Sequence, residues 1–200
     1  MGQYYHVITK DNNGQQTVYN MQTTKFTGDN FREYNGLKLM EHSYWKNPFC
    51  VALAEKLVDK PMRVCWCGDY AEEDEAEAVG FKYSDIWSDN AKEVAIEPSD
   101  FDMDSVAFLV NKTKGEYIDL KKYYKKSVFT AKWKDESWDM CIFPIALLTA
   151  LGNDRGGGDY HEGAGTDFDK VGRWAFDEIY LTNSLPENLT ELEVMFKENR

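Results

Sequence analysis

Residues 47–69 read NPFCVALAEKLVDKPMRVCWCGD, a helix signal followed directly by a strand signal. Asn47 is a favourable N-cap residue, and Pro48 suits the first position of a helix. Apolar residues then recur at helical spacing on one face, until Lys60-Pro61 prevents the helix from continuing. The sequence therefore predicts one clear helix at about 47–59.

The strand that follows, Met62–Cys67, is apolar on both of its alternating faces, which is typical of a strand in the middle of a sheet. Its two cysteines, Cys65 and Cys67, are two residues apart and so point to the same face. The strand ends at Gly68-Asp69, and ligands of open α/β sheets gather at the carboxyl ends of strands. Asp69 is therefore a candidate site residue, and an ordinary turn is the alternative interpretation.

The remaining pattern is mostly β-structure. Turn signals between alternating segments predict two hairpins, a short helix follows Pro144 with Gly152 at its C-terminal cap, and two strands end the chain. These elements are a hairpin around 11–14, a hairpin around 111–115, a helix at 145–151, and strands at 171–181 and 190–197. The sum predicts an α+β fold, with a mostly antiparallel sheet of about six to eight strands, one clear helix and one or two short helices. We expect residues 1–200 to form a single globular domain.

Charge is distributed unevenly along the chain, whose net charge is −12 and whose pI is about 4.7. Residues 69–104 carry 13 acidic residues and two lysines, an excess of 13 − 2 = 11 negative charges, and are read as an acidic, insertion-like segment. Residues 121–134 carry six lysines. The acidic balance argues against direct nucleic-acid binding. The acidic segment is either a solvated face or an interaction surface, and the two segments could also meet in a homo-oligomer or coexist on a monomer.

Metal sites, cofactors and membrane segments are not expected. The four cysteines form no CxxC pair, which favours buried free thiols over a zinc site. Asp100-x-Asp102-x-Asp104 lacks the glycine and the glutamate of a calcium loop. No apolar run is long enough for a signal peptide or a membrane span, so we expect a cytoplasmic protein.

The densest glycine content lies in residues 151–163, LGNDRGGGDYHEG. Backbone N–H groups of such a run can form an anion-binding nest, and an arginine beside it can bind a phosphate. Acidic, phenolic and imidazole groups in the same run could orient a ligand or move a proton. The candidate residues are Arg155, Gly156, Gly157, Gly158, Asp159, Tyr160 and His161. The run matches neither a Walker A loop nor a GxGxxG fingerprint, so a plain surface loop is the alternative.

Aromatic residues elsewhere could complete such a site. Trp45, Tyr160 and Trp174 are candidates to line a pocket, and His42 lies close to Trp45 in the sequence. The resulting hypothesis is a soluble, non-enzymatic binding protein of the inhibitor or sponge type that phages and mobile elements carry. It would bind a nucleotide-like or phosphate-bearing small ligand, or mask a protein partner that has a basic surface.

Two alternatives remain open. The first is a hydrolase or transferase that acts on a nucleotide or phosphoester through His161, Asp69 and Asp159, with Arg155 as the anion clamp. The second is an acidic nucleic-acid mimic that uses residues 69–104 to inhibit a nucleic-acid-binding protein.

Overall fold

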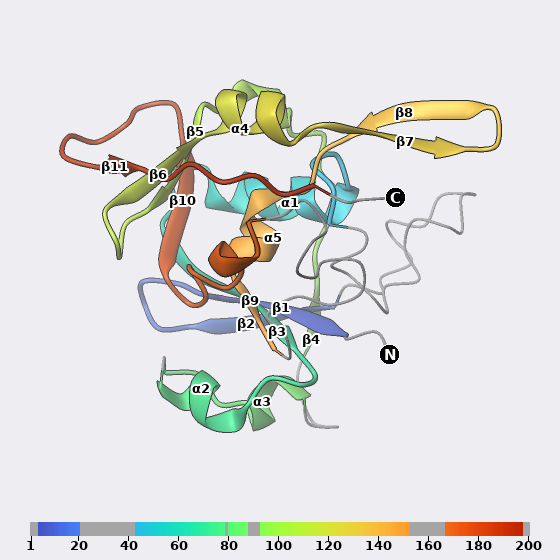
Figure 1. Ribbon diagram of the computed structural model, residues 1–200. Helices are drawn as coiled ribbons and strands as arrows, with labels where there is room; N and C mark the ends of the chain where they lie inside the picture. Colours follow the sequence, from blue (N-terminus) through green and yellow to red (C-terminus); the bar gives the residue numbers. More distant parts are fainter. Residues whose placement is uncertain (1–3, 21–42, 79, 88–92, 153–166, 198–200) are drawn as a thin grey trace.

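The computed structural model describes residues 4–20, 43–78, 80–87, 93–152 and 167–197 (Figure 1). Its centre is β3 (Met62–Gly68), which pairs with β1 (Tyr5–Lys10), β10 (Glu178–Thr182) and β9 (Ala150–Leu151). The main sheet has the order β11-β6-β5-β10-β3-β1-β2-β4, with β9 added beside β3. The other strands are β2 (Gln16–Asn20), β4 (Glu93–Ala95), β5 (Phe108–Asn111), β6 (Glu116–Asp119) and β11 (Thr190–Glu191).

The α+β class is confirmed. Pairing within the described sheet is mainly antiparallel, and three pairs are parallel: β2 with β4, β3 with β9, and β6 with β11. Each parallel pair includes a strand of only two or three residues. Such short strands give no periodic signal, and they bring the described sheet to nine strands.

Helix α1 (Pro48–Leu57) is the clear helix that the sequence predicts. Asn47 caps it, because its side chain accepts hydrogen bonds from the N–H groups of Phe49 (2.9 Å) and Cys50 (3.3 Å). The chain turns extended at Val58, ahead of the proline that forbids further helix. The shorter helices are α2 (Glu73–Ala78), α3 (Ser84–Trp87), α4 (Leu120–Ser127) and α5 (Pro144–Leu148).

Strand β3 separates two hydrophobic clusters. Val64 and Trp66 face the larger cluster, which includes the buried faces of α1 and α5. Cys65 and Cys67 face the smaller one, whose buried members are Ile8, Val18, Cys65, Cys67, Ala71, Phe81, Ile86 and Phe176. All four cysteines are free and buried, as the sequence predicts.

The acidic segment begins as the cover of the smaller cluster. Helices α2 and α3 lie below the sheet in Figure 1 and contribute Ile86, while Phe81 lies between them. Further along, Asp102 caps a 3-10 turn at Met103–Ser105 by accepting the N–H of Asp104 at 3.0 Å.

The predicted strand at 171–181 is wrong over its first half. The chain makes consecutive turns through 171–176, and only β10 is a strand. Gly172 (φ 73°) and Phe176 (φ 61°) both adopt left-handed backbone angles that no strand contains. Tertiary packing of Phe176 into the smaller cluster outweighs the β-propensity of this aromatic segment.

The predicted end of the short helix is also wrong. Helix α5 ends at Leu148 with Thr149 as its cap, so Gly152 is not a cap residue. Ala150 and Leu151, which lie between Thr149 and Gly152, pair with β3 and therefore do not continue the helix.

The last strand is shorter than predicted. Only Thr190–Glu191 pair with β6, yet the alternation of the segment is correct, since Val194 and Phe196 are buried. A separate hairpin, β7 (Phe129–Trp133) with β8 (Glu136–Met140), projects from the body as an arm (Figure 1). Within the described ranges, no helix has the length and apolar character needed to cross a membrane.

Candidate functional site

Most of the sequence-predicted site lies outside the described residues. This holds for Arg155, Gly156, Gly157, Gly158, Asp159, Tyr160 and His161, and also for His42. Their roles stay predictions. The described residues on either side of this glycine-rich segment, and Asp69, can be placed.

The parallel pair of β3 and β9 brings the two predicted sites to one edge of the sheet. Trp66 pairs with Ala150 and Cys67 with Leu151, so both strands run the same way and end together. Asp69 follows the end of β3, and the glycine-rich segment follows the end of β9. In the sequence these positions are more than 80 residues apart.

Asp69 is fixed at this edge by three hydrogen bonds. The N–H of Tyr4 donates to Asp69 Oδ1 (3.1 Å), and the N–H of Asp69 donates to the Tyr4 carbonyl (2.9 Å). The Tyr83 hydroxyl donates to the Asp69 carbonyl (2.8 Å). Asp69 is half-buried, and these hydrogen bonds hold it in place, so it is not at the tip of a free turn.

Three tyrosines are linked to Asp69, Tyr4 and Tyr83 by hydrogen bonds and Tyr70 as the next residue of the chain. Tyr4 is 40% exposed and Tyr70 is 44% exposed, so both offer aromatic surface to solvent. Burial, followed by the negative charges of Cys67, Asp69 and Glu72, raises the pKa of Tyr83 to about 12. Tyr83 therefore stays protonated near neutral pH and remains a hydrogen-bond donor.

A histidine and a tryptophan lie just behind this edge. His6 on β1 pairs with Cys67, and its ring meets that of Trp87 edge-on at 4.1 Å between centroids. Sequence reasoning missed Tyr4 and Tyr83 as partners of Asp69, and His6 and Trp87 behind them. No local signal could have joined them, because they come from the start of the chain, from β1 and from the α2–α3 segment.

The two tryptophans predicted to line a pocket are core residues in the structure. Trp45 is 4% exposed, stacks on Tyr123 and meets Tyr124 edge-on. Trp174 is fully buried, and its Nε1 donates to Glu116 at 2.8 Å. Aromatic surface at the sheet edge comes instead from the tyrosines beside Asp69.

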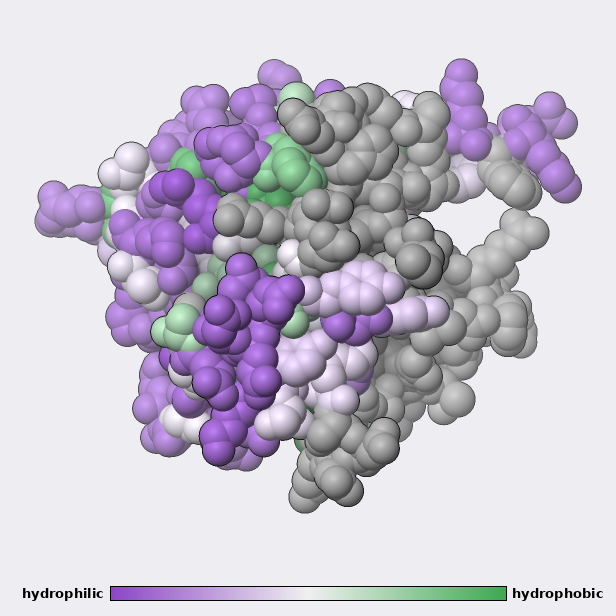
Figure 2. All heavy atoms as spheres, turned by 60° about the horizontal axis from the view of Figure 1, so that its bottom comes forward, coloured by the Kyte–Doolittle hydropathy of each residue, from purple (hydrophilic) through white to green (hydrophobic). Residues whose placement is uncertain are grey.

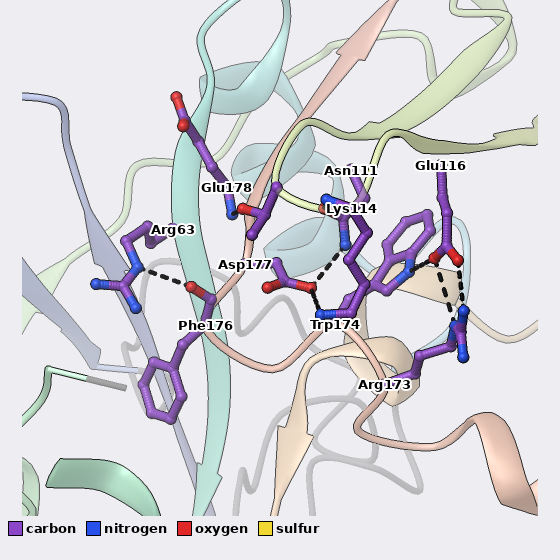
Figure 3. Close-up of polar contacts among 10 residues, drawn as sticks. Arg63, Asn111, Lys114, Glu116, Arg173, Trp174, Phe176, Asp177 and Glu178 are labelled. Atoms are coloured by element: carbon purple, nitrogen blue, oxygen red, sulfur yellow. Dashed lines mark hydrogen bonds and ion pairs between the residues drawn. The ribbon is translucent and has the colours of Figure 1, made fainter. Parts of the chain in front are cut away.

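A polar network fixes the chain after the glycine-rich segment (Figure 3). Buried Asp177 accepts a hydrogen bond from Asn111 Nδ2 (2.8 Å) and forms an ion pair with Lys114 Nζ (2.7 Å). The Glu116 carboxylate likewise accepts hydrogen bonds from the Arg173 guanidinium and from Trp174 Nε1. Although burial acts against it, these two donors hold the pKa of Glu116 below its usual value.

Further contacts anchor the same flank. Asp167 and Met195 form two hydrogen bonds. The N–H of Asp167 donates to the Met195 carbonyl (2.9 Å), and the N–H of Met195 donates to Asp167 Oδ2 (2.7 Å). The N–H of Gly172 donates to the Leu147 carbonyl at 2.8 Å. With β9 paired to β3 on the other side, the described residues on both flanks of 153–166 are tied to the rest of the fold by hydrogen bonds.

In the part of the chain that the structure describes, no group of three or more His, Cys, Asp or Glu side chains is arranged to hold a metal ion. Comparison with protein-family models, with curated proteins and with solved structures found no match to this chain.

Proposed function

We propose that the protein is a non-enzymatic binding protein that takes a nucleotide-like or phosphate-bearing small ligand at the edge where β3 and β9 end. The observation that carries the proposal is the parallel pairing of these two strands, which gives Asp69 and the glycine-rich segment a common edge. Strand carboxyl ends are the usual ligand positions in sheets that contain parallel strands.

The residue types support a division of roles. Arg155 and the amides of Gly156, Gly157 and Gly158 suit a phosphate, through a charge-assisted fork and a backbone nest. A carboxylate repels phosphate but accepts hydrogen bonds from sugar hydroxyls, so Asp69 suits the sugar. Its Oδ1 already accepts the Tyr4 N–H, which fixes the direction of the second oxygen.

Exposed tyrosine rings suit the remaining part of such a ligand. A base has an aromatic face, and stacking on a tyrosine contributes about 1–3 kcal/mol per base. Tyr4 and Tyr70 are both exposed; Tyr4 is bonded to Asp69 through its main-chain N–H, and Tyr70 follows Asp69 in the sequence. A nucleotide would therefore meet a phosphate-binding, a hydroxyl-binding and a base-stacking group at one edge.

The test is calorimetric titration of inorganic phosphate and a panel of nucleoside mono- and triphosphates. We expect binding of at least one nucleotide, lost in Arg155→Ala and kept in Arg200→Ala, which removes the same charge elsewhere in the chain. Asp69→Asn should weaken nucleotide binding but leave phosphate binding intact. No binding, or equal binding by both arginine variants, would refute the proposal. Turnover of the bound nucleotide would instead support the enzyme alternative with His161 and Asp159.

A second candidate function, masking of a protein partner with a basic surface, is favoured by the acidic α2–α3 side. Figure 2 turns this side of Figure 1 forward and shows strongly hydrophilic side chains next to side chains of intermediate hydropathy. Glu72, Glu73 and Glu75 are exposed there. Their combined reversal to lysine should abolish a pull-down of such a partner, and an unchanged salt dependence of binding would exclude this function.

A further inference from the structure

Helix α4 carries more positive charge than its own chain neutralises. Lys122 pairs with Glu191 (2.8 Å) and Lys126 with Glu193 (3.6 Å), both in the C-terminal segment that crosses the helix. Lys121 and Lys125 are exposed, and neither has an ion-pair partner among the residues described. Because they are four positions apart, they repel each other on one face of the helix. Among the residues that the structure describes, this lysine face has no ion-pair partner.

Helix α2 has the opposite charge and the same lack of neutralisation. Glu73, Asp74, Glu75 and Glu77 are all exposed. No lysine or arginine of the described ranges forms an ion pair with them. Repulsion again acts between residues four positions apart, Glu73 and Glu77.

Exposed apolar side chains lie close in the sequence to each of these two charged helices. Tyr4, Tyr70, Val94 and Trp138 are the large hydrophobic residues that are at least 40% exposed in the described structure. Tyr70 precedes α2 by a few residues, and Trp138 belongs to the β7–β8 arm that follows α4. Aromatic residues are enriched at protein interfaces, and complementary charges determine which surfaces meet.

The two faces lie at opposite ends of the molecule. Figure 1 shows α2 and α3 at the bottom of the view, whereas α4 and the arm lie at the top. They cannot neutralise each other within one chain. We propose that the α4 face docks on the α2 face of a second copy of this chain, so that copies associate head to tail. This goes beyond the proposed ligand binding, which does not require it.

The salt dependence of self-association should distinguish this contact from a simple attraction between opposite charges, which only weakens as salt is added. Each copy carries a net charge of −12, so whole molecules repel each other while the two faces attract. At about 0.01 M salt the Debye length is about 30 Å, and the repulsion between whole molecules acts in full. At about 0.15 M it is about 8 Å, so only charges in contact are felt, and at about 1 M these too are screened. Association is therefore expected to be strongest at intermediate salt.

The experiment is sedimentation velocity of the full chain over a concentration series at these three salt concentrations. The wild type should associate at intermediate salt, whereas E75K/E77K and K121E/K125E should each associate at least about tenfold more weakly. E55K/E187K, which changes two exposed glutamates away from both faces, is the control matched to E75K/E77K in charge and should behave as the wild type. Circular dichroism establishes that every variant is folded.

Mixing the two reversed variants gives the decisive readout. In the mixture the intact lysine face of E75K/E77K meets the intact acidic face of K121E/K125E, so association should return. Loss of folding cannot produce such a recovery. A monomeric wild type at all three salts, variants that associate like the wild type, or a mixture that stays monomeric would each overturn the proposal. None of these outcomes affects the nucleotide titrations of Arg155→Ala.

Discussion

The two faces of β3 are built from alternate residues of one short strand, yet they are covered in very different ways. On one face, Trp66 is fully buried in the larger cluster beneath α1 and α5. On the other, Cys65 and Cys67 are equally buried, but the cover is a thin layer of two short acidic helices. The two faces are therefore equally buried, and they differ in the size of the hydrophobic cluster that covers each of them.

This difference bears on function, because Asp69 stands where β3 passes into the thin layer. Its hydrogen-bond partner Tyr83 belongs to that layer, while its partner Tyr4 precedes β1. The larger cluster supplies a rigid support, and the thin side supplies polar and aromatic groups at the sheet edge.

The largest expected effect follows from truncating the core on each face. Trp66→Ala should lower the free energy of unfolding by about 3–5 kcal/mol, because a large cavity opens in a packed core. Phe81→Ala should instead free the α2–α3 layer locally, with a smaller change in global stability. Denaturant unfolding measures the first effect.

Hydrogen exchange and thiol alkylation measure the second. In Phe81→Ala, amides of residues 71–87 and the thiols of Cys65 and Cys67 should become accessible, while Cys50 on the buried face of α1 stays protected. Equal alkylation of Cys50 and Cys65 would show that both faces open together.

A smaller effect is expected in the polar network after the glycine-rich segment. Asp177→Ala leaves the fully buried Asn111 amide without its acceptor, and should cost about 1–3 kcal/mol. Lys114 is 38% exposed, so water can replace its partner, and Lys114→Ala should cost at most about 1 kcal/mol. Thermal unfolding compares the two, and a larger loss for Lys114→Ala would contradict this account of the network.

Much of the fold could be predicted from the sequence, because local signals decided it. The cap at Asn47, the stop at Pro61 and the two-sided apolar strand at 62–67 gave the helix and the central strand. The turn at 171–176 could not be predicted, since Phe176 takes a left-handed backbone angle to pack between strand and layer. Its aromatic neighbours give the same pattern as a strand.

The candidate site was predicted only in part, for a similar reason. Asp69 and the glycine-rich segment were recognised separately, and their common edge depends on β9, a two-residue strand with no signal of its own. The sequence predicts that Trp45 and Trp174 line an aromatic pocket, but a tryptophan packs equally well in a core, and both are buried there. Tertiary contacts decide between these roles.

Lowering the pH should reveal the ion pair between Glu116 and Arg173, in the polar network after the glycine-rich segment. The pKa of Glu116 lies below its ordinary value of 4.5 in the folded state, so the unfolded chain binds the proton more readily. The stability that Glu116 contributes is therefore present above about pH 4.5 and is lost as the pH falls through the lower folded-state value. Glu116→Gln should cost about 1 kcal/mol at pH 7, and the difference from the wild type should shrink in acid. A difference that grows in acid would reverse the assigned sign.

Another small effect is expected at the link between the thin layer and Asp69. Tyr83→Phe removes one hydrogen bond to the Asp69 carbonyl and should cost about 0.5–1.5 kcal/mol. Because the ring remains, the packing of the layer should be unchanged in hydrogen exchange. Faster exchange throughout residues 71–87 would mean that the hydroxyl, rather than the ring, holds the layer.

Native mass spectrometry of the freshly purified protein tests the proposed binding site most directly. The wild type and Arg200→Ala are predicted to carry a bound phosphate-bearing compound that is released on denaturation, and Arg155→Ala is predicted to carry none. A wild type that is empty and has the bare chain mass, or an Arg155→Ala variant that keeps the same compound, would contradict a phosphate site at the edge of β3 and β9.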